Sequence, residues 1–437
     1  MSDTIFALSS APGRAGVAVI RVSGPQAQHS ITRLAGAAPF TPRLATLRRL
    51  RDEGGAAIDQ ALVLWFPAPA SFSGEDMAEV HIHGGAAIVG KVLDTLAGFA
   101  GCRPAEPGEF TRRAVENGKL DLTQAEAVAD LIDAQTEGQR RQALLQYGGT
   151  LKETYENWRC RLITVLAWAE AAIDFSDEEL PADLWSRSLS HIRDILKEIQ
   201  THITDSRRGE IVREGLYLTV IGPPNAGKSS LVNALARRNV AIVAEVAGTT
   251  RDIIEVKLDL GGYAVVVADT AGLREASETV ESEGVRRALA RAEASDLVLL
   301  LLDGTVADPL KGLPPEAVAT ASLTVWNKAD LPFFCDRSGP RLSLKTGEGL
   351  DTVLETIERK VAEMLDRDQE GPVLTRARHR HALEQAIAAL ARALSATEVE
   401  LFAEDLRMAV RAVGRITGRV DVEELLDVVF ADFCIGK

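Results

Sequence analysis

Apolar and polar residues follow three different spacings along the chain, and each spacing predicts a different kind of structure. Up to about residue 119, short apolar runs such as Val17 to Val22, Ala61 to Phe66 and Val80 to Ile82 alternate with breaks of Gly, Pro and Ser. One helical stretch, Ala86 to Ala97, interrupts them. Strand-length runs between turn residues, combined with a helix, predict a mixed α/β domain over residues 1–119.

Helical periodicity begins at Thr123 and continues for almost a hundred residues. Glu126 follows Thr123 by three positions, the spacing of a capping box, so we expect a helix to begin there. In the next helix apolar residues recur at steps of four and three, which places them on one stripe. The stripe consists of Leu151, Tyr155, Trp158, Leu162, Val165, Ala169 and Ile173. A further helix is expected over about 183–206. Because such stripes must be buried against other helices, the pattern predicts a helical region over 120–213.

Strands and helices alternate from about residue 214 to residue 373, which is typical of an α/β domain. The expected strands are 216–221, 253–260, 263–268, 297–302 and 323–326, with a hairpin at Gly261-Gly262. From residue 374 to 437 the chain is helical again, and its apolar stripes have no partner within their own segment. The earlier helices are the available partner. We therefore predict a discontinuous helical bundle, 120–213 and 374–437, with the α/β domain 214–373 inserted into it.

Composition and charge narrow the class of protein. Of the 437 residues 46% are hydrophobic and 26% charged, which excludes wholesale disorder and a collagen-like repeat. No apolar run approaches the roughly 20 residues that span a bilayer, and the first ten residues lack the features of a signal peptide, so a cytoplasmic protein without a membrane span is expected. The net charge of −14 means that any contact with nucleic acid requires a local basic face.

Gly222-Pro-Pro-Asn-Ala-Gly227-Lys228-Ser229 follows an expected strand and opens an expected helix. This context turns the G-x-x-x-x-G-K-S pattern into a phosphate loop, in which glycines let backbone N–H groups face a phosphate. Lys228 adds positive charge at the β- and γ-phosphates, and Ser229 offers a hydroxyl to Mg²⁺.

Three further motifs follow in the order that a GTP site requires. Asp269-Thr-Ala-Gly272 ends one strand, where the Asp269 carboxylate can hold magnesium through water and the Gly272 N–H can meet the γ-phosphate. Asn327-Lys-Ala-Asp330 ends another, and its carboxylate can accept from guanine N1–H and the 2-amino group together. Adenine offers neither donor, and an unpaired buried carboxylate costs about 1–3 kcal/mol or more, so the motif selects GTP over ATP. Ser343-Leu344-Lys345 falls where a loop would cover the guanine, and the whole set resembles the small, Ras-like GTPases.

The hydrolytic machinery is less plain from the residues. Thr250 in Gly248-Thr-Thr-Arg-Asp252 is the expected second hydroxyl ligand of magnesium, and Leu273 occupies the position where Ras-like GTPases orient water with glutamine. Another group must therefore orient the water, and Arg274, Glu275, Glu278, Glu281 and Glu283 are all nearby in the sequence. Asn225 either binds a monovalent cation beside the phosphates, in place of an arginine finger, or only stabilises its loop.

Signatures across the whole chain resemble the MnmE (TrmE) family of tRNA modification GTPases. They are Pro12-Gly-Arg-Ala-Gly-Val-Ala-Val-Ile-Arg21-Val-Ser-Gly24, Ser71-Phe-Ser-Gly-Glu-Asp76, Pro107-Gly-Glu-Phe-Thr-Arg112, Lys119-Leu-Asp-Leu-Thr-Gln-Ala-Glu126 and Phe433-Cys-Ile-Gly-Lys437, with Pro-Asn-Ala-Gly-Lys-Ser-Ser and Asp-Thr-Ala-Gly-Leu-Arg. The resemblance implies an N-terminal tetrahydrofolate-binding-like domain that also forms a homodimer. It implies partnership with the FAD enzyme MnmG in a heterotetramer. Together they would add an aminomethyl or carboxymethylaminomethyl group to C5 of the wobble uridine, U34, of certain tRNAs.

The same resemblance assigns roles to residues. A K⁺ site would use Asn225, Ala244, Val246 and Thr249, and Glu281 would orient the water as the catalytic residue. A reduced folate, 5-formyltetrahydrofolate or 5,10-methylenetetrahydrofolate, would bind Arg21, Glu79, Lys119 and Lys437. Magnesium would bind Ser229 and Thr250. The motifs and the resemblance together assign GTP binding to Asn225, Ala226, Gly227, Lys228, Ser229, Ser230, Ala244, Glu245, Val246, Ala247, Gly248, Thr249, Thr250, Asp269, Thr270, Ala271, Gly272, Asn327, Lys328, Asp330, Ser343, Leu344 and Lys345.

The residues partly support the folate assignment. Alternation in Ala78-Glu-Val-His-Ile-His-Gly buries Val80 and Ile82 and puts Glu79, His81 and His83 on the opposite face. A ligand site, a solvated strand face and a His-x-His zinc site all remain open at this point.

Two questions about RNA also stay open. Arg407, Arg411, Arg415 and Arg419 form a positive stripe that is either a solvated face or a contact for tRNA phosphates, and residues 376–381 are a second candidate. The alternative function is an Era-like GTPase switch or assembly factor that binds RNA without covalent chemistry on it.

Overall fold

The computed structural model describes residues 3–174, 184–204, 206–238, 240–242, 255–269, 292–334, 338–365 and 374–420, together with Leu426, Val429, Phe430, Phe433 and Gly436. The chain divides into two compact units. The first contains Met1–Ala129, Tyr147–Ile192 and Ala388–Lys437, and the second contains Asp130–Gln146 and Arg193–Ile387. Each unit is considered by itself.

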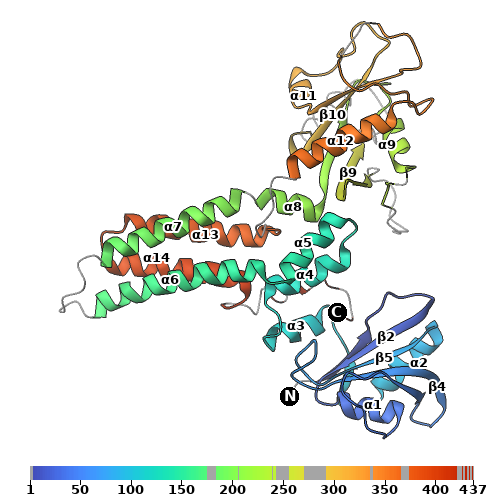
Figure 1. Ribbon diagram of the computed structural model, residues 1–437, viewed down its shortest axis with the longest axis vertical. Coiled ribbons are helices and arrows are strands. Elements are labelled where there is room, and N and C mark those ends of the chain that lie inside the picture. The colour runs from blue at the N-terminus through green and yellow to red at the C-terminus, as the bar shows by residue number, and fades with distance from the viewer. Residues whose placement is uncertain are drawn as a thin grey trace, which may run out of the picture. The chain divides into compact units, whose positions relative to one another are not determined.

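A six-stranded sheet is the centre of the N-terminal part of the first unit (Figure 1). Its spatial order is β3 (Thr46–Arg51), β4 (Ala57–Phe66), β5 (Met77–Gly84), β2 (Ala15–Ser23), β1 (Thr4–Leu8) and β6 (Cys102–Pro104). Neighbouring strands are antiparallel except β1 and β6, which are parallel. The sheet confirms the α/β domain that the short apolar runs predict.

Helices cover both faces of this sheet. α1 (Ala27–Ala35) and α2 (Ala86–Ala97) pack on one face, where Ile20, Val22 and Val80 are fully buried. On the other face Ile5 and Ala7 of β1 pack with Phe110 of α3 (Glu109–Glu116). Arg21 of β2 lies on this second face, because its guanidinium is 5.7 Å from the ring centre of Phe110.

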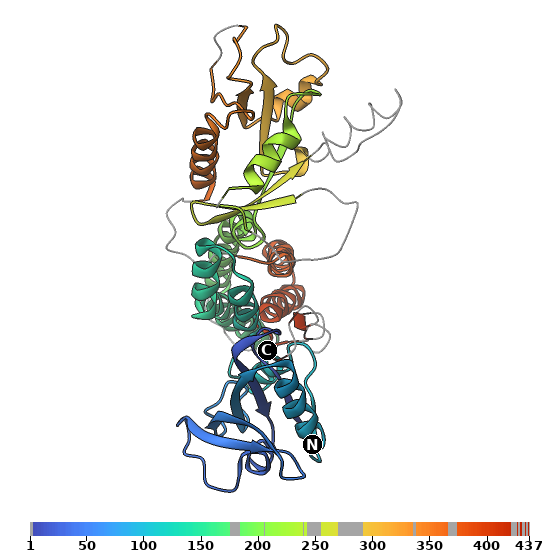
Figure 2. The ribbon, with the colours of Figure 1, turned by 90° about the vertical axis from the view of Figure 1, so that its right-hand side faces the viewer.

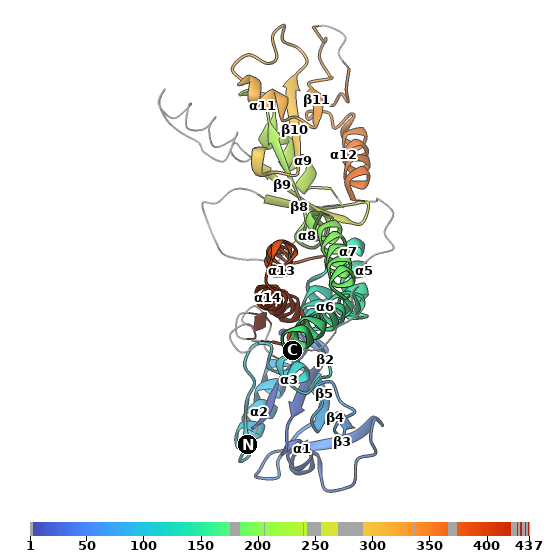
Figure 3. The ribbon, with the colours of Figure 1, turned by 90° about the vertical axis from the view of Figure 1, so that its left-hand side faces the viewer.

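The helical part of the first unit pairs an early helix with a late one. α6 (Thr150–Asp174) and α14 (Val399–Thr417) lie side by side, as the views along the helices show (Figures 2 and 3). Six of the seven residues on the expected stripe of α6 are buried, and Ile173 is half-buried. Trp185 at the start of α7 (Leu184–Thr204) contacts Phe402 of α14 with ring centroids 4.6 Å apart. The pairing confirms a bundle built from segments on both sides of the inserted domain. α13 (Ala377–Ser395) and α7 run through both units.

The start of α4 (Leu122–Asp133) differs from the expectation. The helix begins at Leu122, and the carboxylate of Asp121 accepts from the backbone N–H of Thr123 at 2.7 Å and of Gln124 at 3.0 Å. The predicted cap at Thr123 is therefore wrong, because Asp121 already satisfies the free N–H groups of the first turn. Thr123 donates its own hydroxyl to the same carboxylate at 2.6 Å.

The second unit contains a five-stranded sheet in the order β11 (Leu323–Asn327), β10 (Leu297–Asp303), β7 (Leu216–Ile221), β9 (Tyr263–Asp269) and β8 (Glu255–Leu260). β8 is antiparallel to β9 and the other pairs are parallel. Gly261 and Gly262 turn between β8 and β9 with φ of 61° and 86°, a backbone that glycine adopts without strain. The parallel strands direct their carboxyl ends to one edge, where ligands bind in such sheets.

The helices of the second unit lie on both faces of this sheet. α9 (Lys228–Ala236) and α12 (Leu350–Leu365) contribute Leu231, Val232, Val353 and Ile357 to the core of one face, and Ala317 of α11 (Pro315–Ala319) packs on the other. α5 (Glu137–Tyr147) and α8 (Ser206–Glu214) belong to this unit as well. The expected inserted α/β domain is confirmed, whereas the exact boundaries 1–119, 120–213, 214–373 and 374–437 stay a prediction. Among the helices that the structure describes, none is both long and apolar enough to cross a membrane.

Candidate functional site

The phosphate loop joins β7 to α9, as its motif predicts. Gly227 adopts φ of 104°, and a Cβ at this position would lie 2.5 Å from the side-chain nitrogen of Asn327. Only glycine fits both the backbone and the close contact. Lys228 donates to the carbonyl oxygens of Gly222 and Pro223 at 2.8 and 3.0 Å, so its ammonium lies over the loop. Backbone N–H groups at the N-terminus of α9 favour an anion such as phosphate.

The base-binding motif begins where β11 ends, and Asn327 connects it to two other segments. Its side-chain nitrogen donates to the carbonyl of Ala226 in the phosphate loop at 2.7 Å. Its side-chain oxygen accepts from the N–H of Lys328 at 2.7 Å and of Leu344 at 3.3 Å. Asn327 is 4% exposed, so one buried amide ties the phosphate loop, the base motif and the 343–345 loop together.

Asp330 stands at the surface at the end of this motif, and its carboxylate accepts from the Ser343 hydroxyl at 2.7 Å. That hydrogen bond lowers the pKa of Asp330 and outweighs the opposing effect of desolvation, while a backbone hydrogen bond and the charges of Lys345 and Lys328 lower it further. The carboxylate is therefore ionised at neutral pH. It can accept two parallel N–H donors, as guanine presents.

Several predicted residues of this site lie outside the described residues. They are Ala244, Glu245, Val246, Ala247, Gly248, Thr249, Thr250, Thr270, Ala271, Gly272 and Glu281. The backbone of Asp269 ends β9, next to β7 in the sheet. Of the expected K⁺ ligands the structure describes Asn225, which is exposed and adopts φ of 65°, a left-handed conformation that asparagine tolerates.

A second group of predicted residues meets on the N-terminal sheet. Arg21 of β2 and Glu79 of β5 are direct cross-strand partners. The Arg21 Nη2 atom lies 2.9 Å from Glu79 Oε1, and each side chain is 19% exposed. The guanidinium of Arg21 also stacks at 5.1 Å from the ring centre of Phe72 and 5.7 Å from that of Phe110. The arginine is thus fixed by a carboxylate and two aromatic rings.

The alternation expected in β5 is confirmed, because Val80 and Ile82 are buried in the core of the α1–α2 face while Glu79, His81 and His83 alternate with them. His83 donates through its backbone to Asp59 at 2.8 Å, and its ring lies 2.8 Å from the same carboxylate. Burial opposes the ionisation of Asp59, but these hydrogen bonds outweigh it and lower the pKa of Asp59. Among the described residues no group of three or more His, Cys, Asp or Glu side chains could hold a metal ion.

Lys119 and Arg21 border the same loop, residues 67–76. The ammonium of Lys119 donates to the carbonyl of Pro69 at 3.1 Å, and Phe72 of this loop stacks on Arg21. Gly74 has φ of 81°, and a Cβ there would meet the side chains of Asn117 at 2.9 Å and Lys119 at 3.1 Å. The loop therefore fits between Lys119 and the sheet.

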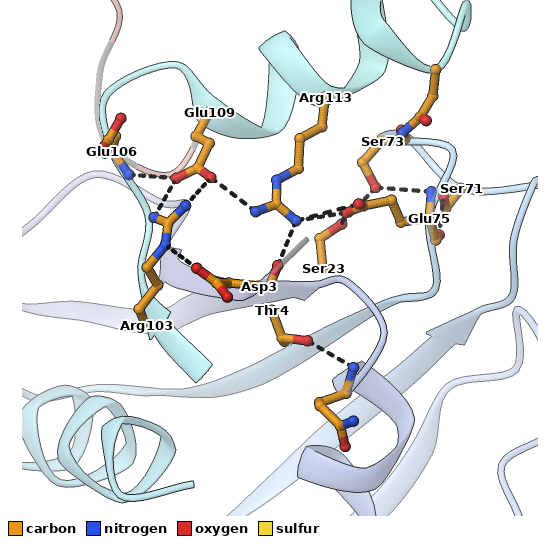
Figure 4. A network of polar contacts seen from close by, with 12 residues as sticks. Asp3, Thr4, Ser23, Ser71, Ser73, Glu75, Arg103, Glu106, Glu109 and Arg113 are labelled. Carbon is orange, nitrogen blue, oxygen red and sulfur yellow. Dashed lines mark hydrogen bonds and ion pairs between the residues drawn. The ribbon is translucent and has the colours of Figure 1, made fainter. Parts of the chain in front are cut away.

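A buried polar network holds this loop against α3 (Figure 4). Arg113 donates to Glu75 at 3.0 Å and to Glu109 at 2.9 Å, and Glu75 accepts from the Ser23 hydroxyl at 2.9 Å. Arg103 completes the network with two hydrogen bonds to Glu109 at 2.7 and 2.9 Å. Sequence reasoning missed this network, although Glu75 and Glu109 lie within two of the signature segments, which is the signal that could have found them.

The fourth predicted folate residue, Lys437, lies outside the described residues, but the residue before it does not. Gly436 accepts at its carbonyl from the Ser9 hydroxyl at 2.8 Å and has φ of 96°. A Cβ at Gly436 would lie 2.1 Å from the carbonyl of Leu8. Leu8 ends β1, whose Ala7 pairs with Arg21, so Gly436 lies close to the strand that carries the arginine.

The two basic clusters are largely occupied by contacts within the protein. In the α14 stripe, Arg407 pairs with Glu170 at 2.5 Å and Arg419 with Glu156 at 3.2 Å. Arg411, Arg415 and Arg419 are exposed. In residues 376–381, Arg376 pairs with Asp130, Arg380 pairs with Glu210, and His379 is fully buried. These ion pairs favour a structural role for Arg407 and Arg419 in the stripe and for Arg376 and Arg380 in the second cluster.

Comparisons with known proteins cover the whole chain. A family model described as the MnmE helical domain matches residues 122–434, and one described as the GTP-binding protein TrmE N-terminus matches residues 4–119. Proteins named tRNA modification GTPase MnmE from Parvibaculum lavamentivorans and Rhodospirillum rubrum are each 53% identical, over 100% of this chain and 100% and 99% of theirs. The protein of that name from Caulobacter vibrioides is 50% identical over the full length of both chains.

Among solved structures, the G domain of the T. maritima FeoB iron transporter matches 34% of this chain and 98% of its own, with 25% identity and a TM-score of 0.26. A TM-score this low supports no conclusion about the fold. The full-length relatives and the two family models establish the family, and they agree with the phosphate loop and base motif described above. The chain belongs to the MnmE family of tRNA modification GTPases.

Proposed function

We propose that this GTPase of tRNA modification depends on K⁺ as well as Mg²⁺. With an FAD-dependent partner resembling MnmG, it installs the aminomethyl or carboxymethylaminomethyl group at C5 of the tRNA wobble uridine, U34. The observation that carries the GTP-binding part of the proposal is the Asn327 side chain, which joins Ala226 of the phosphate loop to the base motif and to Leu344. A single buried residue thus sets the spacing between the phosphate and base subsites of one nucleotide.

The described residues of the nucleotide site would each bind a different part of GTP. Backbone N–H groups of residues 226–229 and the Lys228 ammonium bind the phosphates. Asp330, whose carboxylate is oriented by Ser343, accepts from guanine N1–H and the 2-amino group. The N–H of Leu344 and the side chain of Lys345 lie on the loop that would cover the base. This division of tasks explains a preference for guanine over adenine.

Two cations complete the proposed site. Ser229 and Thr250 would hold Mg²⁺, and Asn225 with the backbone of Ala244 and Val246 and with Thr249 would hold K⁺. The exposed hydroxyl of Ser229 and the exposed amide of Asn225 are oxygen donors, which suit both ions. The two ions would supply positive charge to the phosphate oxygens. Glu281 would orient the attacking water, since Leu273 cannot.

The N-terminal site would bind a reduced folate, 5-formyltetrahydrofolate or 5,10-methylenetetrahydrofolate. Arg21 and Glu79 offer a paired donor and acceptor beside two aromatic rings, and Lys119 adds a cation across the 67–76 loop. Lys437 follows Gly436, which contacts β1. We also propose a homodimer through the N-terminal domains and a heterotetramer with the flavoprotein.

Mass spectrometry of wobble nucleosides tests the proposed modification. tRNA from cells that lack the protein is expected to lose the C5 aminomethyl-type groups, and re-expression of the chain is expected to restore them. If the amount of these C5 groups is the same with and without the protein, the RNA-binding switch is favoured instead. Equilibrium binding of a reduced folate to the intact protein gives an independent distinction, because the switch requires no folate.

The cation assignment predicts a specific response of GTP hydrolysis. Turnover is expected to be faster in K⁺ than in Na⁺, and Asn225→Ala should remove that difference while GDP affinity changes little. Glu281→Ala should lower turnover by about 10²-fold, as loss of a positioned acid–base group does. Equal rates in the two salts for the parent protein, or a Glu281→Ala rate within twofold of it, would contradict these assignments.

A further inference from the structure

An ion pair connects the ends of two neighbouring strands of the second unit, and one of its members belongs to none of the GTPase motifs. Asp303 ends β10, Asn327 ends β11, and the two residues are register partners. The ammonium of Lys328, the second residue of the base motif, donates to the Asp303 carboxylate at 2.5 Å. The charge of Asp303 is therefore directed at the nucleotide-binding motif.

Asp303 is itself held firmly in place. Its second carboxylate oxygen accepts from the N–H of Thr305 at 2.9 Å and from the Thr305 hydroxyl at 2.7 Å, and the side chain is 15% exposed. The N–H of Gly304 donates to the carbonyl of Asn327 at 3.1 Å, which binds the two strand ends together. Burial opposes ionisation of Asp303, but the hydrogen bonds from Lys328 and Thr305 outweigh it and lower its pKa. The carboxylate is thus a fixed negative charge at neutral pH.

The backbone of Lys328 is constrained as well. Its φ is 69°, a left-handed conformation that non-glycine residues adopt only when their surroundings enforce it. Its N–H donates to the Asn327 side chain at 2.7 Å, and its carbonyl accepts from the N–H of Leu331 at 3.0 Å. With both the backbone and the ammonium held, this long side chain has lost much of the rotamer freedom that a lysine has in solution.

We propose that Asp303 is a positioning residue for guanine nucleotides: it orders the Lys328 side chain before the nucleotide binds. The inference rests on the proposed function, because it requires a guanine nucleotide at Asn327, Lys328 and Asp330. A side chain that is already ordered costs less conformational entropy when a ligand binds. Because this contribution is the same for GDP and GTP, it lowers KM and leaves kcat unchanged.

The first test compares Asp303→Asn with the parent protein. The variant keeps the shape of the side chain and an acceptor for Thr305 but loses the charge that holds Lys328. The dissociation constants for GDP and GTP are expected to rise together by about 10-fold, the effect of losing a charge-assisted hydrogen bond, with kcat at saturating GTP within twofold of the parent. Thr305→Val is the matched control, since it removes the hydroxyl that donates to Asp303 and leaves the ion pair with Lys328 intact. Its GDP affinity should stay within twofold of the parent.

A double-mutant cycle separates positioning from a general structural role. Lys328→Met keeps an unbranched apolar stem without the ammonium. If Asp303 acts through Lys328, adding Asp303→Asn to Lys328→Met changes the GDP dissociation constant by less than twofold. If Asp303 only stabilises the strand ends, Asp303→Asn raises the GDP dissociation constant by the same factor in the parent and in Lys328→Met. That result would overturn the proposal.

Asp303→Glu keeps the inference testable if Asp303→Asn does not fold. It retains the charge, so its GDP affinity is expected to lie between that of a neutral variant and that of the parent. The neutral variant is Asp303→Asn or, if that does not fold, Asp303→Ala. A Glu variant that binds no better than the neutral one would overturn the proposal. If the parent protein binds neither GDP nor GTP, both the proposed function and the role of Asp303 are overturned. If the parent binds and Asp303→Asn binds equally well, only the role of Asp303 is overturned.

Discussion

Single side chains hold the candidate sites together by joining several segments at once. Asn327 contacts the phosphate loop, its own motif and the 343–345 loop. Glu109 of α3 does the same beside the N-terminal sheet, where it accepts from Arg103, from Arg113 and from the N–H of Glu106. Each of these residues is less than 10% exposed, so the loss of either removes hydrogen bonds to several segments from a buried position.

The pH dependence of stability should reveal the contribution of Glu109. Burial opposes its ionisation, but the hydrogen bonds from Arg103, Glu106 and Arg113 outweigh this and lower its pKa from 4.5. A lowered pKa in the folded state gives stability that is fully present above the unfolded value and is lost as pH falls through the folded one. Glu109→Gln is therefore expected to lower the free energy of unfolding by about 2 kcal/mol at pH 7, because it breaks a buried ion pair.

Urea unfolding at several pH values checks this expectation. The difference between the parent and Glu109→Gln should shrink below about pH 4.5 and approach zero as the carboxyl group of the parent is protonated. Glu106→Gln is the control, since this exposed neighbour contributes its backbone and should change stability little at any pH. A difference that stays constant down to pH 3 would contradict an electrostatic origin.

How far single residues could be predicted depends on how they act. The phosphate-loop glycines, Lys228 and Asp330 follow from motifs in which each side chain has one chemical task. The tie made by Asn327 and the network around Arg113 were not predicted, because they join residues distant in sequence through hydrogen bonds that leave no periodic pattern. For the same reason the stripe of arginines on α14 looked free in the sequence, although Glu170 and Glu156 pair with Arg407 and Arg419.

At the scale of elements, α5 illustrates a packing that hydrophobic periodicity does not reveal. Several of its contacts within the second unit are made to backbone atoms. The N–H of Gly138 donates to the carbonyl of Gly262 at 2.8 Å, and the amides of Gln139 and Gln142 donate to the carbonyls of Arg213 and Gly209. The apolar stripes of α6 and α14 were predictable because burial of side chains requires a repeating pattern. A helix docked through polar groups has no such requirement.

The contact between α5 and the β8–β9 turn predicts the effect of one methyl group. A Cβ at Gly138 would lie 2.8 Å from the carbonyl of Gly262 and 3.2 Å from the ring of Tyr263. Gly138→Ala should therefore displace the turn and cost about 1–3 kcal/mol, as overpacking does. Hydrogen exchange should become faster at the N–H of residue 138, whose hydrogen bond to Gly262 would be weakened.

Gly90→Ala is the matched control for this prediction. Gly90 lies inside α2, and a Cβ there meets nothing within 4 Å. The same substitution should stabilise the protein by about 0.5–1 kcal/mol, because alanine favours a helix over glycine. Equal effects of the two substitutions would mean that the contact between Gly138 and the turn contributes nothing.

At the scale of the whole molecule, the insertion of one domain into another requires the chain to cross twice, and one carboxylate holds both crossings. Asp130 accepts from Arg213, three residues before β7, at 3.1 Å and from Arg376, three residues after residue 373, at 2.8 Å. A cavity of about 150 Å³ lies beside these groups and is lined by Gln139 and Thr375 among others. Entry and exit of the inserted domain are thus tied to the same point within the second unit.

Asp130→Asn should loosen both crossings together. Because the pair is partly exposed, we expect a loss of about 1–2 kcal/mol, with hydrogen exchange near Gly215 and His379 accelerated by similar factors. Asp133→Asn is the control, since this exposed residue lies on the same helix and lines the same cavity. Acceleration at one crossing without the other would show that Asp130 does not couple them.

The contact between Ser9 and Gly436 spans 427 positions of sequence. Since a ribosome makes the chain from its N-terminus, β1 emerges long before the residues that pack against it. Phe430 and Phe433, which surround Gly108, arrive equally late. The first domain to be synthesised is therefore among the last to be finished, and a nascent chain halted after residue 420 should carry an incomplete N-terminal fold that molecular chaperones recognise.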